Sequence, residues 1–254
     1  MAPQKKQRFL DWNNKIFVES MKKIDKSIIL IVILDMIFYF LCVSLVILWL
    51  RRLQNQINSF YMPSDIFALG YNQAHQLVGD IKSFYFMIIL AFILLLLAII
   101  LLASIFKGII WAITTKTKPS FKFVSKFLTL NLIWLGFWFF IAILIATYVQ
   151  GGFIQAYFFS MILIALYLTN NLYSIYMSNQ KLKSIIESLS MSFRKIHLFL
   201  LPSVVVVLIF YIVSRITSLM HFKLAPIVEF VIFISLVAIA RFYFSTLATK
   251  IHSM

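Results

Sequence analysis

Charged residues are scarce in this sequence, and acidic ones are scarcer than basic ones. Asp, Glu, Lys and Arg make up 12% of its 254 residues, against about 25% in soluble domains. Cys42 is the single cysteine, and there are six glycines and five prolines. So low a charge content excludes an ordinary soluble domain. A lone cysteine excludes an intrachain disulfide and a cysteine-based metal site.

Sequence motifs that would signal catalysis or cofactor binding are missing as well. There is no HExxH zinc motif, no G-x-S-x-G nucleophile turn, no phosphate-binding P-loop and no glycine-rich dinucleotide turn. The four histidines are scattered and form no i, i+4 pair that could bind a metal. The apolar runs contain one aspartate, whereas an intramembrane aspartyl protease would need two. We therefore expect no enzyme activity, no cofactor and no metal.

Apolar residues are what the chain has in excess, at 63%, and they fall in six long runs. The run over 27–50 is 24 residues long and contains one charge, Asp35. As an α-helix rising about 1.5 Å per residue it would reach roughly 36 Å, enough to cross a hydrocarbon core of about 30 Å. The predicted fold class is all-α, a polytopic membrane protein with six transmembrane helices. These spans are expected at 27–50, 83–106, 126–149, 155–177, 197–217 and 226–248.

Basic, amphipathic segments stand beside these spans. In residues 1–26, seven Lys and Arg alternate with apolar side chains at helical spacing, which predicts a helix over about 9–25 lying on the membrane face. The alternative is a solvated basic tail. A similar pattern over 178–196 predicts a second interfacial helix, and 107–125 is the third basic segment. Between the first two spans, Ser64 is placed to cap a short amphipathic helix outside the membrane.

The basic residues are distributed unequally between the two sides of the expected spans. Segments on the side of the N-terminus hold 17 Lys and Arg, whereas the opposite loops hold four. Because positively charged loops stay in the cytoplasm, both termini are predicted to be cytoplasmic. On this topology 1–26 is an N-terminal cytoplasmic segment, 27–248 the transmembrane domain and 249–254 a cytoplasmic tail. The basic residues favour anionic lipid headgroups as partners and give no reason to expect nucleic acid.

Four ionisable residues lie within the spans or near their ends, and their charges sum to zero. Asp35 and Arg241 are at matching depths, about 12 Å and about 10 Å from the cytoplasmic ends of their spans, and are predicted to pair. Arg215 and Glu229 match in the same way near the outer ends. Because a lone charge at the bilayer centre costs about 2.5–3.5 kcal/mol or more, two intramembrane ion pairs are expected.

Transport is the functional alternative for Asp35, which would then relay a proton or a cation. Candidates for a polar path beside it are Asn131, Asn170 and Asn171, although interhelical hydrogen bonding is the commoner use of such residues. Transport sites usually recruit several polar groups and helix breaks, whereas these spans contain one internal glycine and one proline. A structural ion pair is therefore the favoured interpretation.

The two cytoplasmic elbows carry a family resemblance. They read KTKPSFKFVSKFLTLNLIWLGFWF over 116–139 and NQKLKSIIESLSMSFRKIHLFLLPSVVVV over 179–207. With a basic loop, a Ser-led amphipathic helix and then a span, residues 83–248 resemble uncharacterised prokaryotic six-span proteins, which are similar to the membrane domain attached to some glycerophosphodiester phosphodiesterases. The sequence contains no phosphodiesterase domain. The resemblance therefore implies a stand-alone helical module of a prokaryotic plasma membrane that acts with lipids or a partner.

Together these features predict a non-enzymatic integral membrane module whose cytoplasmic face contacts anionic lipid, a protein partner or another copy of the chain. The main alternative is a small transporter or permease subunit that uses Asp35 and Arg241. The third is a membrane enzyme acting on lipids. A water-filled cavity reaching Asp35 would favour transport, whereas a sealed ion pair would favour the module.

Overall fold

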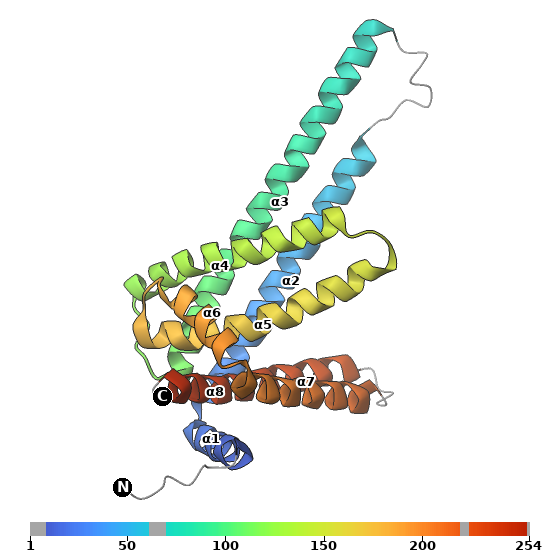
Figure 1. The fold of residues 1–254 in the computed structure, drawn as a ribbon. Coiled ribbons are helices and arrows are strands. Elements are labelled where there is room, and N and C mark those ends of the chain that lie inside the picture. The colour runs from blue at the N-terminus through green and yellow to red at the C-terminus, as the bar shows by residue number, and fades with distance from the viewer. Residues whose placement is uncertain (1–8, 61–69, 219–223, 253–254) are drawn as a thin grey trace, which may run out of the picture. The chain divides into compact units, whose positions relative to one another are not determined.

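The structure, a computed structural model, describes residues 9–60, 70–218 and 224–252. Within these ranges the regular structure is helical and no strand occurs. The elements are α1 Phe9–Lys23, α2 Ser27–Ser59, α3 Tyr71–Thr114, α4 Phe121–Tyr148, η1 Gly151–Phe153, α5 Ile154–Asn179, α6 Ser184–Arg194, α7 Ile196–Ser218 and α8 Ala225–His252 (Figure 1). Among the described helices α2, α3, α4, α5, α7 and α8 are long and apolar enough to cross a membrane, which confirms the predicted all-α architecture of six spans.

Helices α2 and α3 are longer than the spans predicted for them. α2 continues past Leu50 to Ser59, and α3 runs without interruption over 44 residues. At about 1.5 Å per residue α3 reaches roughly 66 Å, so it extends well beyond the thickness of a hydrocarbon core. A separate amphipathic helix is wrong for residues 71–82, because no proline interrupts them and they form the first turns of α3. Ser64, its predicted cap, lies outside the described residues.

Local backbone geometry explains where several helices begin and end. Ser120 caps α4, because its side chain accepts a hydrogen bond from the Phe123 N–H at 3.2 Å. Gly151, with φ of +76°, adopts the left-handed conformation that turns the chain from α4 into α5. Gln180, at φ +49°, terminates α5 with its N–H bonded to the Tyr176 carbonyl at 2.7 Å. The chain therefore leaves α5 sharply and forms α6 as a separate short helix.

Packing divides the chain into two compact units. The larger comprises Met1–Met36 and Ser104–Met254, and the smaller comprises Ile37–Ala103. Helices α2 and α3 each contribute to both. In the smaller unit they form a hairpin in which Trp49 of α2 packs on Phe92 of α3, with ring centroids 6.0 Å apart. Phe60 packs on Phe84 in the same way at 5.0 Å.

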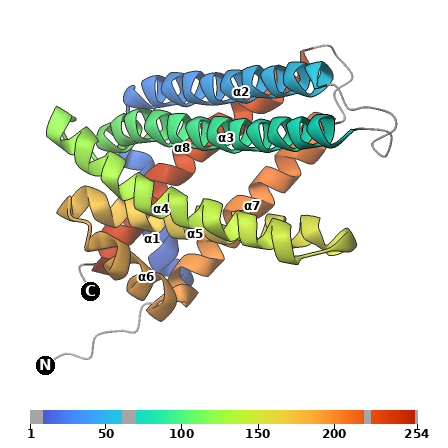
Figure 2. The same cartoon turned by 90° about the horizontal axis from the view of Figure 1, so that it is seen from above.

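Helix α5 lies at the centre of the larger unit. It packs against α4, α6 and α8, while α7 pairs with α8 and α1 lies across α8. α4 and α5 run alongside each other in both views (Figure 1, Figure 2). Helices α1, α4, α6 and α7 are therefore each connected directly to α5 or α8.

The core where α3, α4 and α5 meet is aromatic. The ring of Phe127 lies 4.9 Å from that of Tyr173 and 5.5 Å from that of Tyr176, and all three side chains are buried. Gly108 of α3 faces this cluster, because a Cβ there would lie 3.2 Å from Phe127 Cδ1. The absence of a side chain at Gly108 therefore allows α3 and α4 to approach closely.

Helix α1 packs in part against the protein. Ile16, 2% exposed, belongs to a buried cluster with the last turns of α8, so the apolar face of α1 is covered in part by protein. Two polar contacts hold it there: Lys250 Nζ lies 3.2 Å from Glu19 Oε2, and Lys23 Nζ donates to Thr246 Oγ1 at 3.3 Å. A solvated tail is therefore wrong for α1, and its contact with lipid stays a prediction.

Replacing Gly108 by leucine tests the close approach of α3 and α4. The added side chain would overlap Phe127, and such overpacking typically costs about 1–3 kcal/mol of stability. Gly136 of α4 is the matched control, since a Cβ at that position meets nothing within 4 Å. In detergent, Gly108→Leu should lower the midpoint of thermal unfolding while Gly136→Leu leaves it nearly unchanged. Equal midpoints for the two variants would contradict the packing described for Gly108.

Candidate functional site

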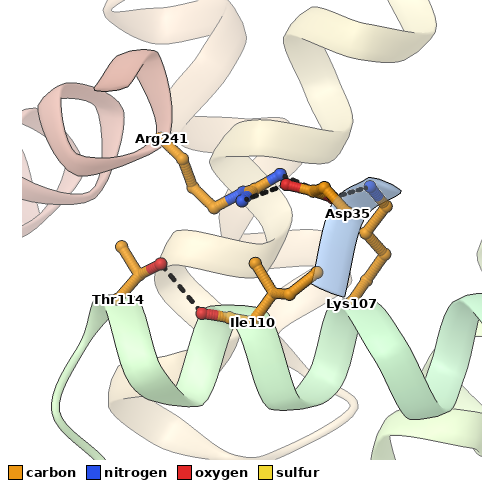
Figure 3. A network of polar contacts seen from close by, with 5 residues as sticks. All are labelled: Asp35, Lys107, Ile110, Thr114 and Arg241. Atoms are coloured by element: carbon orange, nitrogen blue, oxygen red, sulfur yellow. Dashed lines mark hydrogen bonds and ion pairs between the residues drawn. The ribbon is translucent and has the colours of Figure 1, made fainter. Parts of the chain in front are cut away.

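The carboxylate of Asp35 in α2 lies between two cations from other helices. Arg241 of α8 donates through Nη1 to Oδ2 at 3.0 Å, and its Nη2 lies 3.5 Å from Oδ1. Lys107 of α3 places Nζ 2.5 Å from Oδ1. Figure 3 shows the three side chains converging, and we refer to them as the charge triad. The structure thus brings Asp35 and Arg241 together and adds Lys107.

An apolar layer lies next to the charge triad. Ile31, Ile110 and Ala238, each about one turn from the triad residue of its own helix, are 0% exposed and form one cluster with Phe242. These side chains pack α2, α3 and α8 together at the depth where the charges meet. Closely packed apolar side chains therefore adjoin the charges, which interact in a dry interior of low dielectric.

The charge triad is almost completely removed from solvent. The exposed fraction of the side chain is 0% for Asp35, 5% for Arg241 and 14% for Lys107. The Arg241 guanidinium also lies 5.8 Å from the ring centre of Trp111, which is a favourable cation–π distance. With one carboxylate and two cations, the triad carries a formal charge of +1. The carboxylate is the group on which both cations depend.

This geometry suits a structural clamp better than a proton relay. Because no part of Asp35 is exposed, a water-sized sphere does not touch its carboxylate, and proton exchange with water would require the helices to separate. Removing one partner of a buried ion pair typically costs about 3–5 kcal/mol, so a triad joining three helices opposes that separation. The sealed arrangement is the one that the sequence analysis associates with a membrane module.

Lys107 is the triad member that sequence reasoning missed. It directly follows the apolar run that ends at Phe106, which places it in a cytoplasmic loop by hydropathy alone. α3 continues to Thr114, whose hydroxyl donates to the Ile110 carbonyl at 2.8 Å within the last turn (Figure 3). The apolar residues 109–113 indicate that the helix continues past Lys107, because the lysine interrupts the second apolar run and does not end it.

The second predicted ion pair has other partners in the structure. Glu229 accepts a hydrogen bond from Ser214 Oγ at 3.0 Å. Arg215 donates through Nε to the Tyr211 hydroxyl at 3.2 Å, and its guanidinium lies 5.3 Å from the centre of that ring. These contacts still join α7 to α8 through Glu229. The direct pairing of Arg215 with Glu229 stays a prediction.

Asn131 belongs to an interhelical hydrogen-bond network. Its Nδ2 donates to Ser104 Oγ at 3.0 Å, and its Oδ1 accepts from the Tyr173 hydroxyl at 2.6 Å, so one buried amide joins α3, α4 and α5. Nearby, Trp134 Nε1 donates to Thr169 Oγ1 at 2.9 Å and links α4 to α5 again. Both the nitrogen and the oxygen of the Asn131 amide are bonded within the protein. These contacts are interhelical hydrogen bonds, the commoner use of such residues in membrane spans.

Asn171 and Asn170 of α5 make contacts other than those of Asn131. Asn171 is 0% exposed and donates through Nδ2 to Ser192 Oγ of α6 at 2.9 Å. The backbone carbonyl of Asn170 accepts a hydrogen bond from Ser174 Oγ of the same helix at 2.8 Å. Four buried polar atoms have no hydrogen-bond partner among the described residues: Trp138 Nε1, Asn171 Oδ1, Tyr176 Oη and Ser184 Oγ. The structure therefore does not bring the three asparagines together as one path.

Asp25 makes a solvent-exposed ion pair at the start of α2. Its carboxylate accepts the Ser27 N–H at 3.0 Å and lies 3.1 Å from Lys116 Nζ, just after α3. Hydrogen bonding from Ser27, followed by that from Lys116, lowers the pKa of Asp25 to about 2. The stabilisation is therefore complete above the unfolded pKa of about 3.9 and is lost as the pH falls through about 2.

The fold and the site define a class: a helical protein whose described residues include six helices able to cross a membrane, three of which are joined by a buried charge triad. Among the described residues no three His, Cys, Asp or Glu side chains come together as a metal site. No family model, curated protein or solved structure matches the chain. The resemblance to the membrane domain of some glycerophosphodiester phosphodiesterases therefore stays a prediction.

The charge triad predicts a rank order of stability among three variants. Asp35→Leu leaves two buried cations without a counter-ion and should cost about 3–5 kcal/mol. Arg241→Leu and Lys107→Leu each leave one neutral ion pair, so both should cost less. The measurement is the midpoint of thermal unfolding in detergent. Asp35→Asn keeps the shape of the side chain without its charge and should be nearly as damaging as Asp35→Leu, whereas three equal losses would mean that the carboxylate does not hold both cations.

Proposed function

We propose that the protein is a non-enzymatic integral module of a prokaryotic plasma membrane, with both termini in the cytoplasm and its cytoplasmic face on anionic lipid. The observation that carries this proposal is the way α6 packs. Three of its four serines are buried, whereas two of its large apolar side chains, Ile186 and Phe193, are exposed. Such an orientation is unfavourable in water and favourable at the boundary between headgroups and acyl chains.

The inner face of α6 consists of serines spaced four residues apart. Ser184, Ser188 and Ser192 are 0%, 2% and 0% exposed, and they pack against α5. Ser192 accepts from Asn171 through Oγ, and its carbonyl accepts from the Tyr167 hydroxyl at 3.0 Å. Small side chains allow the two helices to approach closely, and Ser192 adds a hydrogen bond between them.

The outer face of α6 carries the apolar residues. Ile186 is 70% exposed and Phe193 is 65% exposed, and Leu182 just before the helix is 44% exposed. Helical spacing over 178–196 predicts a single apolar face. The structure divides this face, since Ile185 and Leu189 pack against the aromatic core. The outward residues remain as a compact apolar surface about two turns long.

Basic residues stand at both ends of this apolar surface. Lys181 and Lys183 precede the helix and Arg194 ends it, and all three are exposed. Each Lys or Arg close to an anionic membrane surface contributes about 1 kcal/mol of attraction, which falls off within a Debye length. Apolar insertion and basic charge at one place fit an in-plane anchor on anionic lipid. The cytoplasmic orientation agrees with the excess of basic residues on this side.

The sealed charge triad supports the module over the transporter. A relay would need water or a second polar group at Asp35, whereas both carboxylate oxygens are held by Lys107 and Arg241. Two of the three asparagines that would extend a path, Asn131 and Asn171, are used in separate interhelical bonds. Nothing in these contacts favours a second function.

The lipid contact of α6 can be tested with the full-length protein in liposomes. In a Cys42→Ala background, Ile186→Cys and Phe193→Cys are labelled with an environment-sensitive fluorophore. With anionic lipid present, we expect blue-shifted emission and quenching by nitroxide-labelled acyl chains at both positions. The matched control is Lys118→Cys, an exposed position in the basic segment before α4, which should report water.

Two other outcomes would contradict the lipid contact. Emission typical of water at 186 and 193 would mean that the apolar surface is not inserted. Blue-shifted emission without quenching by labelled lipid would mean that a protein surface, such as a second copy of the chain, covers α6. Equal quenching in neutral and anionic liposomes at every salt concentration would remove the electrostatic part of the proposal.

Orientation is tested by labelling single cysteines from one side of the membrane. In the same Cys42→Ala background, cysteines at Lys118 and Lys181 should react only from the cytoplasmic side, and those at Asn72 and Gly152 only from the outside. All four positions are exposed. Reaction of Asn72 from the cytoplasm would overturn the orientation, and reaction of Lys118 and Lys181 from opposite sides would overturn the arrangement of spans between them.

A further inference from the structure

A cavity of about 410 Å³ lies between α1, α7 and α8. Its walls are mainly apolar and include Val205 and Ile209 of α7, Leu236 and Ala240 of α8, and Phe17 of α1. Because α7 and α8 are both long and apolar enough to cross a membrane, this groove opens where acyl chains would surround the protein. Its volume is in the range of roughly 300–1,000 Å³ typical of small-molecule sites.

One end of the groove is polar and is formed by α1. Asn13 and Asn14 line it there, and the Tyr243 hydroxyl donates to Asn13 Oδ1 at 3.3 Å. The Phe17 ring packs edge-on against Tyr243, with centroids 6.0 Å apart. α1 thus gives the groove amide groups at one end and leaves the rest of its length apolar.

A second hollow, of about 440 Å³, adjoins the groove at Asn14, which lines both. It runs along the exposed face of α1 and is lined by Lys15 and Lys22 together with Asp11 and Glu19. Glu19 already pairs with Lys250 at 3.2 Å. With Glu19 paired to Lys250, the remaining charged side chains Asp11, Lys15 and Lys22 carry a net charge of +1. This face therefore offers one net positive charge to a ligand whose apolar part lies in the groove and whose polar part passes Asn14.

The dimensions of the groove decide between a lipid and a helix as its occupant. The wall residues extend over 205–210 in α7 and 236–243 in α8, which is about 10 Å of helix at 1.5 Å per residue. A transmembrane helix from a partner would need a surface of about 30 Å. It would also meet α1 at the polar end. A flexible acyl chain fits a short groove that is closed on one side.

We propose that this groove binds one acyl chain of a phospholipid, with the phosphate on the Lys15 and Lys22 face of α1. It is distinct from the α6 surface, and it rests on the proposed function only in taking α7 and α8 to lie in a membrane. α1 then has three contacts. Its buried side packs against α8, the side-chain amides of Asn13 and Asn14 line one end of the groove, and Lys15 and Lys22 bind the lipid headgroup.

Two matched pairs of variants test the groove. Val205 lines it and Val204 does not, yet each is 46% exposed on α7. One turn later, Ile209 lines the groove at 42% exposed, whereas its neighbour Leu208 does not at 52% exposed. A tryptophan at 205 or 209 should occupy the space of the acyl chain, and a tryptophan at 204 or 208 should leave it open.

The measurement is native mass spectrometry of the full-length protein extracted from membranes in a mild detergent. Wild type, Val204→Trp and Leu208→Trp should each retain one phospholipid per chain. Val205→Trp and Ile209→Trp should retain at least tenfold less, with thermal midpoints equal to those of their controls. Lys15→Gln combined with Lys22→Gln should lower retention severalfold, because the groove remains but the headgroup loses its cations.

Several outcomes would overturn the proposal. These are a wild type that carries only detergent or nothing, equal retention in lining and control variants, and an adduct whose mass is that of a protein subunit. Retention unaffected by the lysine changes would overturn the assignment of the phosphate to α1. None of these results depends on the fluorophores on α6. Lipid binding in the groove can therefore be disproved while the lipid contact of α6 stands, and the contact of α6 can be disproved while lipid binding in the groove stands.

Discussion

One buried carboxylate organises the larger unit of this protein. Asp35 has no exposed surface, and it is held by Lys107 from α3 and by Arg241 from α8. In a low-dielectric interior an unpaired charge is strongly unfavourable, so the three helices are constrained to keep these groups together. The first and last long helices of the described chain are thereby joined. The apolar layer around Ile31 and Ala238 keeps water away from the contact.

Packing in the rest of this unit uses small side chains and polar bonds where large apolar ones would be expected. Gly108 lets α3 meet the Phe127 ring, and the serines of α6 let it approach α5. Asn131 and Asn171 each use their amide to bond other helices. In an apolar solvent helices gain little from burying leucine against leucine, so close approach and hydrogen bonding hold them together.

The lipid environment that we propose also accounts for the apolar side chains on the surface. Ile186 and Phe193 face outward from α6, and an apolar groove remains open between α7 and α8. In water both features would be liabilities, whereas at a membrane each has a natural ligand. Two helices outside the six long ones, α1 and α6, carry the basic charge beside these apolar surfaces. We interpret both as places where the protein meets phospholipid, one on the bilayer surface and one at a specific groove.

The amino-acid sequence determined the number and type of the long helices, because runs of apolar residues longer than 20 have few alternatives to a membrane-spanning helix. It also predicted the pairing of Asp35 with Arg241, because the two charges have matching depth and opposite sign. Tertiary structure alone decided the role of Lys107, because hydropathy ends the second span at Phe106 while the helix continues to Thr114. It also decided which face of α6 is buried, since that depends on Asn171 of α5 meeting Ser192. Periodicity reveals that a helix has two faces, but only the neighbouring helices select the one that packs.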